Sequence, residues 1–434
     1  MSIDVRARPA EVDRRARTAV AALFLTNGAL FANLVPRFPQ IKADLDMSTA
    51  GYGLTVAAFP AGAITAGLAA AVLIRRFGSA PMAVAGTCFT GAGALAAALG
   101  PSAAVFAAAL FVAGATDAVT DVAQNAHGLR VQRRYGRSII NSFHAVWSIG
   151  AVLGGSMAAG AIALDVPRGV HLGVAAALFS LLAFVALRFC LPGRDDEPND
   201  DPGSAPGTGA QRLPEMSRSR LRPRIVLLIA ALVLIAIGGT IVEDAGSSWA
   251  TLYLSSDLHA AGALAATGYI CLVGAQFVGR MIGDRLVDRF GQRAVARTGG
   301  LMVAVGMGTA LAFPTIPGTI AGFAAAGLGV ATLVPAAMQE ADELPGLRAG
   351  TGLMIVSWLM RLGFLLSPPL VGLLADSAGL RVGLLIVPAA GVLVVLLSGV
   401  LQRRGLPEAG PVVHGPGTGT AAKPVPAVQE SPRS

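Results

Sequence analysis

The stretch from Gly114 to Gly155 reads GATDAVTDVAQNAHG (114–128), LRVQRRYGR (129–137) and SIINSFHAVWSIGAVLGG (138–155). It predicts two hydrophobic helices joined by a short basic loop, because an apolar run precedes the first part and another begins in the last. At about 100° per residue, the polar and small residues gather on one side of each helix. These are Gly114, Asp117, Asp121, Gln124, Asn125 and Gly128 on the first, and Arg137, Asn141, His144, Ser148 and Gly155 on the second. Each helix therefore has a side suited to lipid and a polar side.

The composition extends this pattern to the whole chain. Of its 434 residues, 54% are hydrophobic and only 13% are charged, which no ordinary soluble domain matches. A bilayer core of about 30 Å needs roughly 20 apolar residues per helix, and abundant Gly and Ala allow helices to pack backbone to backbone in lipid. We expect spans at residues 18–36, 50–74, 81–99, 103–127, 138–163, 169–190, 224–253, 261–283, 294–313, 317–340, 348–374 and 380–401. The sequence predicts an all-α membrane protein of twelve transmembrane helices.

The basic residues predict how the chain is oriented. All but six of the 33 Lys and Arg residues fall on the side of the N-terminus. The exceptions are Arg37, Lys42, Arg168 and Arg381 on the opposite side, and Arg280 and Arg361 within spans. The positive-inside rule then predicts that both termini are cytoplasmic.

A polar, Pro- and Gly-rich segment after the sixth span divides the chain in two. We expect a cytoplasmic N-terminal segment (1–17), a six-helix lobe (18–190), a cytoplasmic linker (191–223), a second six-helix lobe (224–402) and a disordered cytoplasmic tail (403–434). The halves echo each other, since RRFG (75–78) after the second span returns as DRFG (288–291) after the eighth. Parallel six-span repeats predict two pseudo-symmetric bundles, as in transporters.

Several classes of function find no support in the sequence. The net charge of +8 comes from Arg residues at helix ends, so it does not indicate a nucleic-acid partner. Cys88, Cys190 and Cys271 lie in apolar runs, which indicates neither a disulfide framework nor a metal site. No signal peptide is expected. We find no phosphate-binding loop and no catalytic set, so we expect no cofactor and no enzyme activity.

Ionisable residues inside the spans are the candidates for proton coupling, because each is costly in hydrocarbon unless it faces a cavity or a partner. They are Asp117, Asp121, His144 and Glu243. Asp117 and Asp121 lie one helical turn apart, where mutual repulsion favours protonation of one of them. The alternative is that these acids only bond polar groups on neighbouring helices, or pair with His144. Asp244 points about 100° away from Glu243, and we interpret it as structural.

Other polar residues are candidates for binding a solute. They are Asn125, Asn141, Trp147 and Arg361. Trp147, beside the polar side of its helix, could stack on a sugar ring, although tryptophans are more often packing or interfacial residues. Arg361 would either hold a substrate anion or neutralise Glu243 or an Asp.

Together these residues resemble the major facilitator superfamily, and within it the fucose-permease-like branch of bacterial permeases. The closest resemblance lies in D-x-x-x-D-x-x-Q-N from Asp117, then GRS (136–138), then H-x-x-W-S-x-G from His144. GDRLVDRFG (283–291) is similar to the superfamily's cytoplasmic loop motif, whereas Arg75 stands where the first copy should have an acid. Glu243 matches an acidic position of the branch, but Ser248 precedes Trp249 where the branch has an Asp.

The resemblance implies a secondary transporter of the bacterial inner membrane that moves a small polar, sugar-like solute by alternating access, coupled to protons and functional as a monomer in the lipid bilayer. Its gating residues would be Arg75, Asp284, Asp288 and Arg289. Drug/proton antiport is the first alternative, although residues 103–127 contain no Arg and Gly150–Gly155 lacks the Pro of that group's motif. The second alternative is a non-transporting receptor or scaffold, which a large folded loop would favour, and none is visible.

Overall fold

The computed structural model describes residues 11–135, 139–193, 223–344, 347 and 351–401. Within these ranges the chain forms helices and no strands. Eleven helices are long and apolar enough to cross a membrane, and a bent pair within residues 49–77 supplies a twelfth span. The predicted all-α fold with twelve spans is confirmed.

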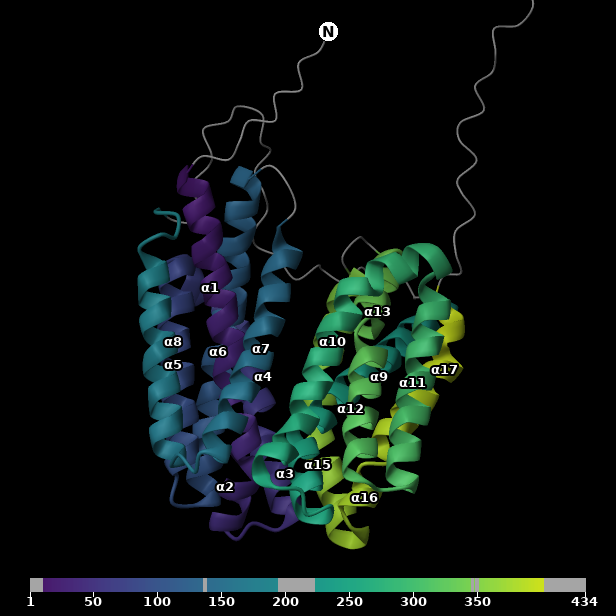
Figure 1. Cartoon of the computed structure of the whole chain (residues 1–434). Coiled ribbons are helices and arrows are strands. Elements are labelled where there is room, and N and C mark those ends of the chain that lie inside the picture. Colours follow the sequence, from purple (N-terminus) through teal and green to yellow (C-terminus); the bar gives the residue numbers. More distant parts are fainter. Residues whose placement is uncertain (1–10, 136–138, 194–222, 345–346, 348–350, 402–434) are drawn as a thin grey trace, which may run out of the picture.

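The helices form two bundles (Figure 1). The first contains α1 (Glu11–Leu34), α2 (Phe38–Asp44), α3 (Thr49–Val56), α4 (Ala58–Phe77), α5 (Ser79–Leu99), α6 (Ala103–Tyr135), α7 (Ile140–Ala163) and α8 (Arg168–Leu187). The second contains α9 (Pro223–Leu252), α10 (Gly262–Phe290), α11 (Gln292–Ala312), α12 (Ile316–Val330), α13 (Leu333–Asp342), α14 (Thr351–Leu359), α15 (Arg361–Ala378), α16 (Leu380–Gly383) and α17 (Ile386–Leu397). Most of the predicted linker and the whole tail lie outside the described residues.

Two predicted loops are helical, which corrects the sequence interpretation. Helix α6 continues through the basic stretch to Tyr135, and α10 continues through the predicted loop motif to Phe290. Neither extension contains a Pro, and the residues 129–135 contain no Gly, so nothing in the backbone chemistry stops the helix at the expected membrane boundary. Arginines in these last turns also interact favourably with the helix C-terminus.

The internal repeat is visible in the backbone where α4 and α10 end. Gly78 has φ +87° and ψ 153°, and Gly291 has φ +82° and ψ 154°. This conformation is almost restricted to glycine, and in both places the next helix begins at the following residue. The repeated FG pair (77–78 and 290–291) therefore makes the same sharp corner in each bundle.

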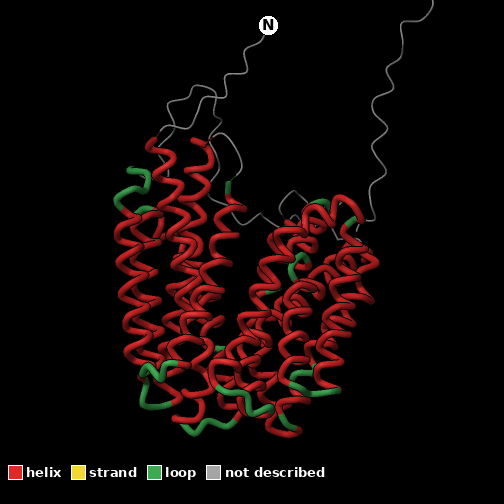
Figure 2. Tube along the Cα trace, viewed as in Figure 1, coloured by secondary structure: helices red, strands yellow, loops and turns green. Residues whose placement is uncertain are grey.

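The bundles meet along two helix pairs, α7 with α10 and α3 with α15. These are the fifth span against the eighth and the second against the eleventh, which are the pairs that a two-fold exchange of the halves interconverts. The bundles diverge toward the side where α1 begins and α17 ends, which we call the terminal side (Figure 1). They converge at α2, α3 and α16, which we call the far side, and Figure 2 shows the short connections that lie there.

Candidate functional site

A cavity of about 310 Å³ lies between the two bundles. Both bundles contribute polar side chains to its wall. From the first these are Asn27, Asp117 and Trp147, and from the second Glu243, Asp244, Ser247, Ser248, Gln276 and Arg361. The apolar part of the wall comes from side chains that include Phe31, Val56, Phe59, Ile64, Val273 and Phe364. The cavity is therefore mixed in character, with polar groups set in an apolar wall.

Asn27 joins three helices on the first-bundle side of this cavity. Its amide nitrogen donates to Asp117 Oδ1 at 2.7 Å, while its Oδ1 accepts from Trp147 Nε1 at 2.8 Å. Gln124, which is fully buried, lies farther off at 3.4 Å from the same oxygen. At Gly28, next to it, an added Cβ would collide with the backbone carbonyl of Trp147. Close packing of α1 on α7 therefore fixes the amide against the indole.

Glu243 occupies the second-bundle side. Its Oε2 accepts from the Gln276 amide at 2.8 Å and lies 3.8 Å from an Arg280 guanidinium nitrogen. The Arg280 side chain is 39% exposed and that of Glu243 is 22% exposed, so water screens this ion pair. Among the described residues Glu243 is therefore paired with Arg280, whereas the sequence left open whether Arg361 neutralises an acid or binds a substrate anion.

Arg361 lies where the eleventh span is interrupted between α14 and α15. Its side chain is exposed, and no carboxylate of the described residues lies within 4.0 Å of its guanidinium. Asp121 of the first bundle is in electrostatic range of both Arg361 and His144. Arg361 is thus a cavity cation that a solute or an acid from the opposite bundle can approach.

The remaining predicted residues lie outside the cavity wall. Asp121 is exposed and accepts the Asn125 amide within α6 at 3.0 Å. His144 is exposed, with its ring edge-on to Phe24 at 5.2 Å between centroids. The side chain of Asn141 lies outside the described residues. Asn125 is therefore held by its own helix and does not face the cavity wall.

The predicted gating residues lie at the terminal-side ends of α4 and α10. All four side chains are exposed, namely those of Arg75, Asp284, Asp288 and Arg289. From the pseudo-symmetry of the two halves we expect Asp288 to lie against the start of the fifth span, and residues 137 and 138 there lie outside the described residues. The gate on this side stays a prediction.

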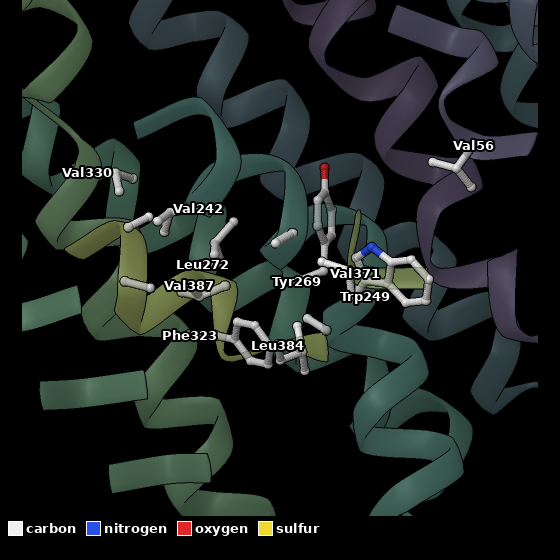
Figure 3. Packing of buried hydrophobic residues seen from close by; sticks show 14 of the residues in the cluster. Val56, Val242, Trp249, Tyr269, Leu272, Phe323, Val330, Val371, Leu384 and Val387 are labelled. Atoms are coloured by element: carbon white, nitrogen blue, oxygen red, sulfur yellow. The ribbon is translucent and has the colours of Figure 1, made fainter. Parts of the chain in front are cut away.

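The far side of the cavity is closed by α3. The Tyr52 hydroxyl donates to the Ser248 carbonyl of α9 at 2.7 Å, and the Tyr52 ring meets Trp249 edge-on at 4.9 Å between centroids. Tyr52 and Trp249 are both fully buried. At the first residue of α3, the Thr49 amide donates to Asp376 of α15 at 2.9 Å. Figure 3 shows Trp249 and Tyr269 within the buried cluster that reaches from the second bundle to Val56 of α3.

A comparison with known protein families identifies the family of this chain. The family model described as Major Facilitator Superfamily matches residues 20–285 and 244–429. The chain belongs to the major facilitator superfamily. The resemblance found in the sequence is confirmed at this level, and the fucose-permease-like branch stays a prediction. As a member of this family, the chain is a multi-pass membrane transport protein and not an enzyme.

Two relatives match about nine tenths of the chain. Membrane protein MosC of Rhizobium meliloti is 28% identical over 393 residues, which cover 90% of this chain and 92% of that protein. Uncharacterized transporter y4wD of Sinorhizobium fredii is 29% identical over 394 residues, covering 88% and 97%.

Solved structures share the fold of this transporter. A mutant of nucleoside transporter NupG superposes with a TM-score of 0.71 at 11% identity, covering 89% of this chain and 99% of that one. A D-xylose-proton symporter superposes with a TM-score of 0.66 at 18% identity, covering 89% and 97%. At these identities the likeness concerns the fold alone.

Sequence reasoning missed several residues of the transporter's cavity wall, among them Asn27, Gln276 and Asp244. Asn27 and Gln276 are uncharged, so a search for ionisable groups passed over them, although an amide inside a span is a signal of the same kind. Asp244 was interpreted as structural from its direction on the helix. The structure places it in the wall beside Glu243.

Proposed function

We propose that this transporter moves a small polar, sugar-like solute by alternating access and couples that movement to protons. The proposal rests on one observation: the cavity between the bundles is lined by the Asn27, Asp117 and Trp147 group on one side and by Glu243 with Gln276 on the other. A solute in the cavity would contact both bundles, which is what alternating access needs of its ligand.

The side chains of the cavity favour a polar, uncharged or weakly charged solute. Amides can both donate hydrogen bonds to hydroxyl groups and accept them, and carboxylates accept them. The Trp147 indole is held in one orientation by Asn27, which suits stacking against a flat sugar face. Transporters of the same fold include a nucleoside transporter and a D-xylose-proton symporter, whose names agree with solutes of this kind.

The acids of the cavity support proton coupling. Asp117 accepts from an uncharged amide and has no ion pair among the described residues. A carboxylate in such a place is costly when ionised, so it is suited to bind a proton in one state and release it in another.

The side assignment follows from the basic residues. With both termini cytoplasmic in a bacterial inner membrane, the terminal side is the cytoplasmic side, and the far side is external. The closure at Tyr52 and Trp249 then belongs to a state that faces the cytoplasm. In this proposal the transporter functions as a monomer, because one chain supplies both walls of the cavity.

Two measurements test the function. A thermal-shift screen of the purified protein against sugars, sugar acids, nucleosides and cationic drugs identifies ligands, because a specific ligand raises the melting temperature by mass action. Uptake of the selected solute into proteoliposomes is then followed with and without an imposed pH gradient. Accumulation only with the gradient supports the proposal, and equal uptake in both conditions rejects proton coupling.

Drug/proton antiport is the second candidate, and the apolar part of the cavity wall favours it. Aromatic and aliphatic side chains such as Phe31, Phe59 and Phe364 suit an amphipathic ligand. The same screen separates the candidates: stabilisation by hydrophobic cations, without stabilisation by sugars or nucleosides, would favour efflux.

A further inference from the structure

Asp244 lies where the cavity meets its far-side closure. Its Oδ1 accepts from the Ser248 hydroxyl at 3.4 Å, whereas its Oδ2 is buried and has no hydrogen-bond partner among the described residues. One turn further along α9, the carbonyl of Ser248 accepts the Tyr52 hydroxyl of α3. Ser248 thus touches both the acid and the closing helix.

The surroundings of Asp244 do not suit a negative charge. A distance of 3.4 Å is long for a bond to a hydroxyl, which normally spans 2.5–3.0 Å. The titratable groups near it are Glu243 on its own helix and Tyr52 on α3, while α15 contributes the hydroxyl of Ser367 and, on the same cavity wall, Arg361. Tyr269 of α10 lies on the same wall. No cation of the described residues lies within 4.0 Å of the Asp244 carboxyl group, so no ion pair in this state replaces the water that an ionised carboxylate needs.

We propose that Asp244 holds a proton while the far side is closed, and that loss of this proton favours separation of α3 from α9. Separation would expose the carboxyl group to water, which stabilises its ionised form. The ionised form therefore favours the state open at the far side, and the neutral form favours the closed state. Asp244 is then the proton-operated part of the far-side gate, an assignment that rests on proton-coupled transport as the function.

The chain carries a reporter for this gate. It contains three tryptophans, at positions 147, 249 and 358. Trp249 is fully buried against Tyr52, so separation of α3 from α9 would expose the indole of Trp249. In a Trp147→Phe/Trp358→Phe background, quenching of Trp249 fluorescence by acrylamide measures that opening in the purified protein without any solute.

The experiment follows the quenching constant from mildly acidic to mildly alkaline pH. We expect it to increase several-fold as the pH rises, because deprotonation favours the open state. Asp244→Asn and Asp244→Ser should keep it low at every pH, while Asp244→Glu should retain the increase. Asp257→Asn is the matched control, since it removes an exposed acid at the far-side end of the same span and should leave the pH response in place.

The outcomes separate this inference from the proposed function. Tyr52→Ala, which removes the closing side chain, should raise quenching at all pH values and so shows that the reporter responds. If it does so while the parent protein is insensitive to pH, or if Asp244→Asn follows the parent curve, the inference is overturned. Loss of the pH response with intact proton-driven uptake rejects only the gate role. An intact response in a protein that transports no solute rejects only the proposed function.

Discussion

The amide nitrogen of Asn27 lies 2.7 Å from Asp117 Oδ1, which links the first span of the transporter to the fourth. The same side chain accepts from Trp147 and so includes the fifth span. A change in the protonation of Asp117 would change what this amide can bond, because a protonated carboxyl group becomes a donor as well as an acceptor. The state of the acid is thereby connected to the orientation of the indole on the cavity wall.

Asn27→Ala should weaken solute binding more than removal of a single contact would. Each neutral hydrogen bond contributes about 0.5–1.5 kcal/mol, and this change frees both Asp117 and Trp147. We expect the Kd to rise by about one order of magnitude, which titration calorimetry with the solute from the screen would measure. Asn125→Ala is the matched control, because its amide bonds only within α6. An unchanged Kd for Asn27→Ala would place solute binding elsewhere.

Asp117→Asn and Glu243→Gln should uncouple transport. Each keeps the size of the side chain but cannot carry a titrating proton. We expect accumulation driven by a pH gradient to be lost, while exchange of labelled for unlabelled solute persists, because exchange needs no net proton movement. Proteoliposomes loaded with solute measure both activities. Gradient-driven accumulation at the parental level in both variants would exclude these two acids as the coupling groups.

The fold could be predicted because hydropathy and charge act locally along the chain. Twelve spans, the two bundles and the corner at Gly78 and Gly291 all have signals within short stretches of sequence. The ends of α6 and α10 have no such local signal, because their arginine-containing last turns lie beyond the apolar runs and contain nothing that breaks a helix. The interruption before Arg361 was also missed, because it depends on packing of the second bundle.

The cavity was predictable only in part. Four of the polar residues predicted from the spans line the cavity, namely Asp117, Trp147, Glu243 and Arg361. Asn125 does not line it and bonds within its own helix. Helical periodicity gives the side of a helix but not which neighbour covers it. For that reason the sequence could not show that Arg280 approaches Glu243, or that Asn27 joins Asp117 to Trp147. Both relationships exist only once distant helices pack.

Gly28→Ala should destabilise the protein, because its Cβ would collide with the Trp147 carbonyl where α1 packs on α7. Overpacking of this kind costs about 1–3 kcal/mol, so the melting temperature should fall. Gly173→Ala on α8 is the control, since nothing lies within 4 Å of its Cβ position. That change should leave the melting temperature unchanged or raise it, as Ala favours a helix over Gly. Equal melting temperatures for the two variants would contradict the close approach of α1 and α7.

Tyr52→Phe should weaken the far-side closure while the aromatic ring still fills the space beside Trp249. The ring keeps its contact with Trp249, but the hydrogen bond to the Ser248 carbonyl is lost. A loss of about 1 kcal/mol shifts a two-state equilibrium about five-fold. Labelling of a Val56→Cys variant by an external, membrane-impermeant thiol reagent, in a background without the three native cysteines, should become faster by a similar factor. Thr55→Ala, whose hydroxyl bonds only groups near its own helix, should leave the rate unchanged.

The last prediction concerns the terminal-side gate, where the two halves of the sequence differ. A helix N-terminus carries roughly half a positive charge. Arg137, at the predicted start of the fifth span, adds a full positive charge there. Asp288, at the exposed end of α10, would stabilise the state closed to the cytoplasm by approaching that site. Arg75 stands at the corresponding position of the first half and cannot act in the same way. Its replacement should therefore have the smaller effect.

Cysteine accessibility from the terminal side measures this difference. His144 is exposed and lies in electrostatic range of Arg280 in the opposite bundle, so a His144→Cys side chain reports whether the bundles separate. In a background without the native cysteines, Asp288→Asn should increase its rate of labelling, because the state open to the terminal side becomes more populated. Arg75→Ala should increase the rate less. Asp284→Asn, an acid one turn earlier on α10, tests whether position matters as well as charge. Equal rates for the parent and Asp288→Asn would leave Asp288 as a surface charge, since exposed charges contribute little unless they meet a defined partner.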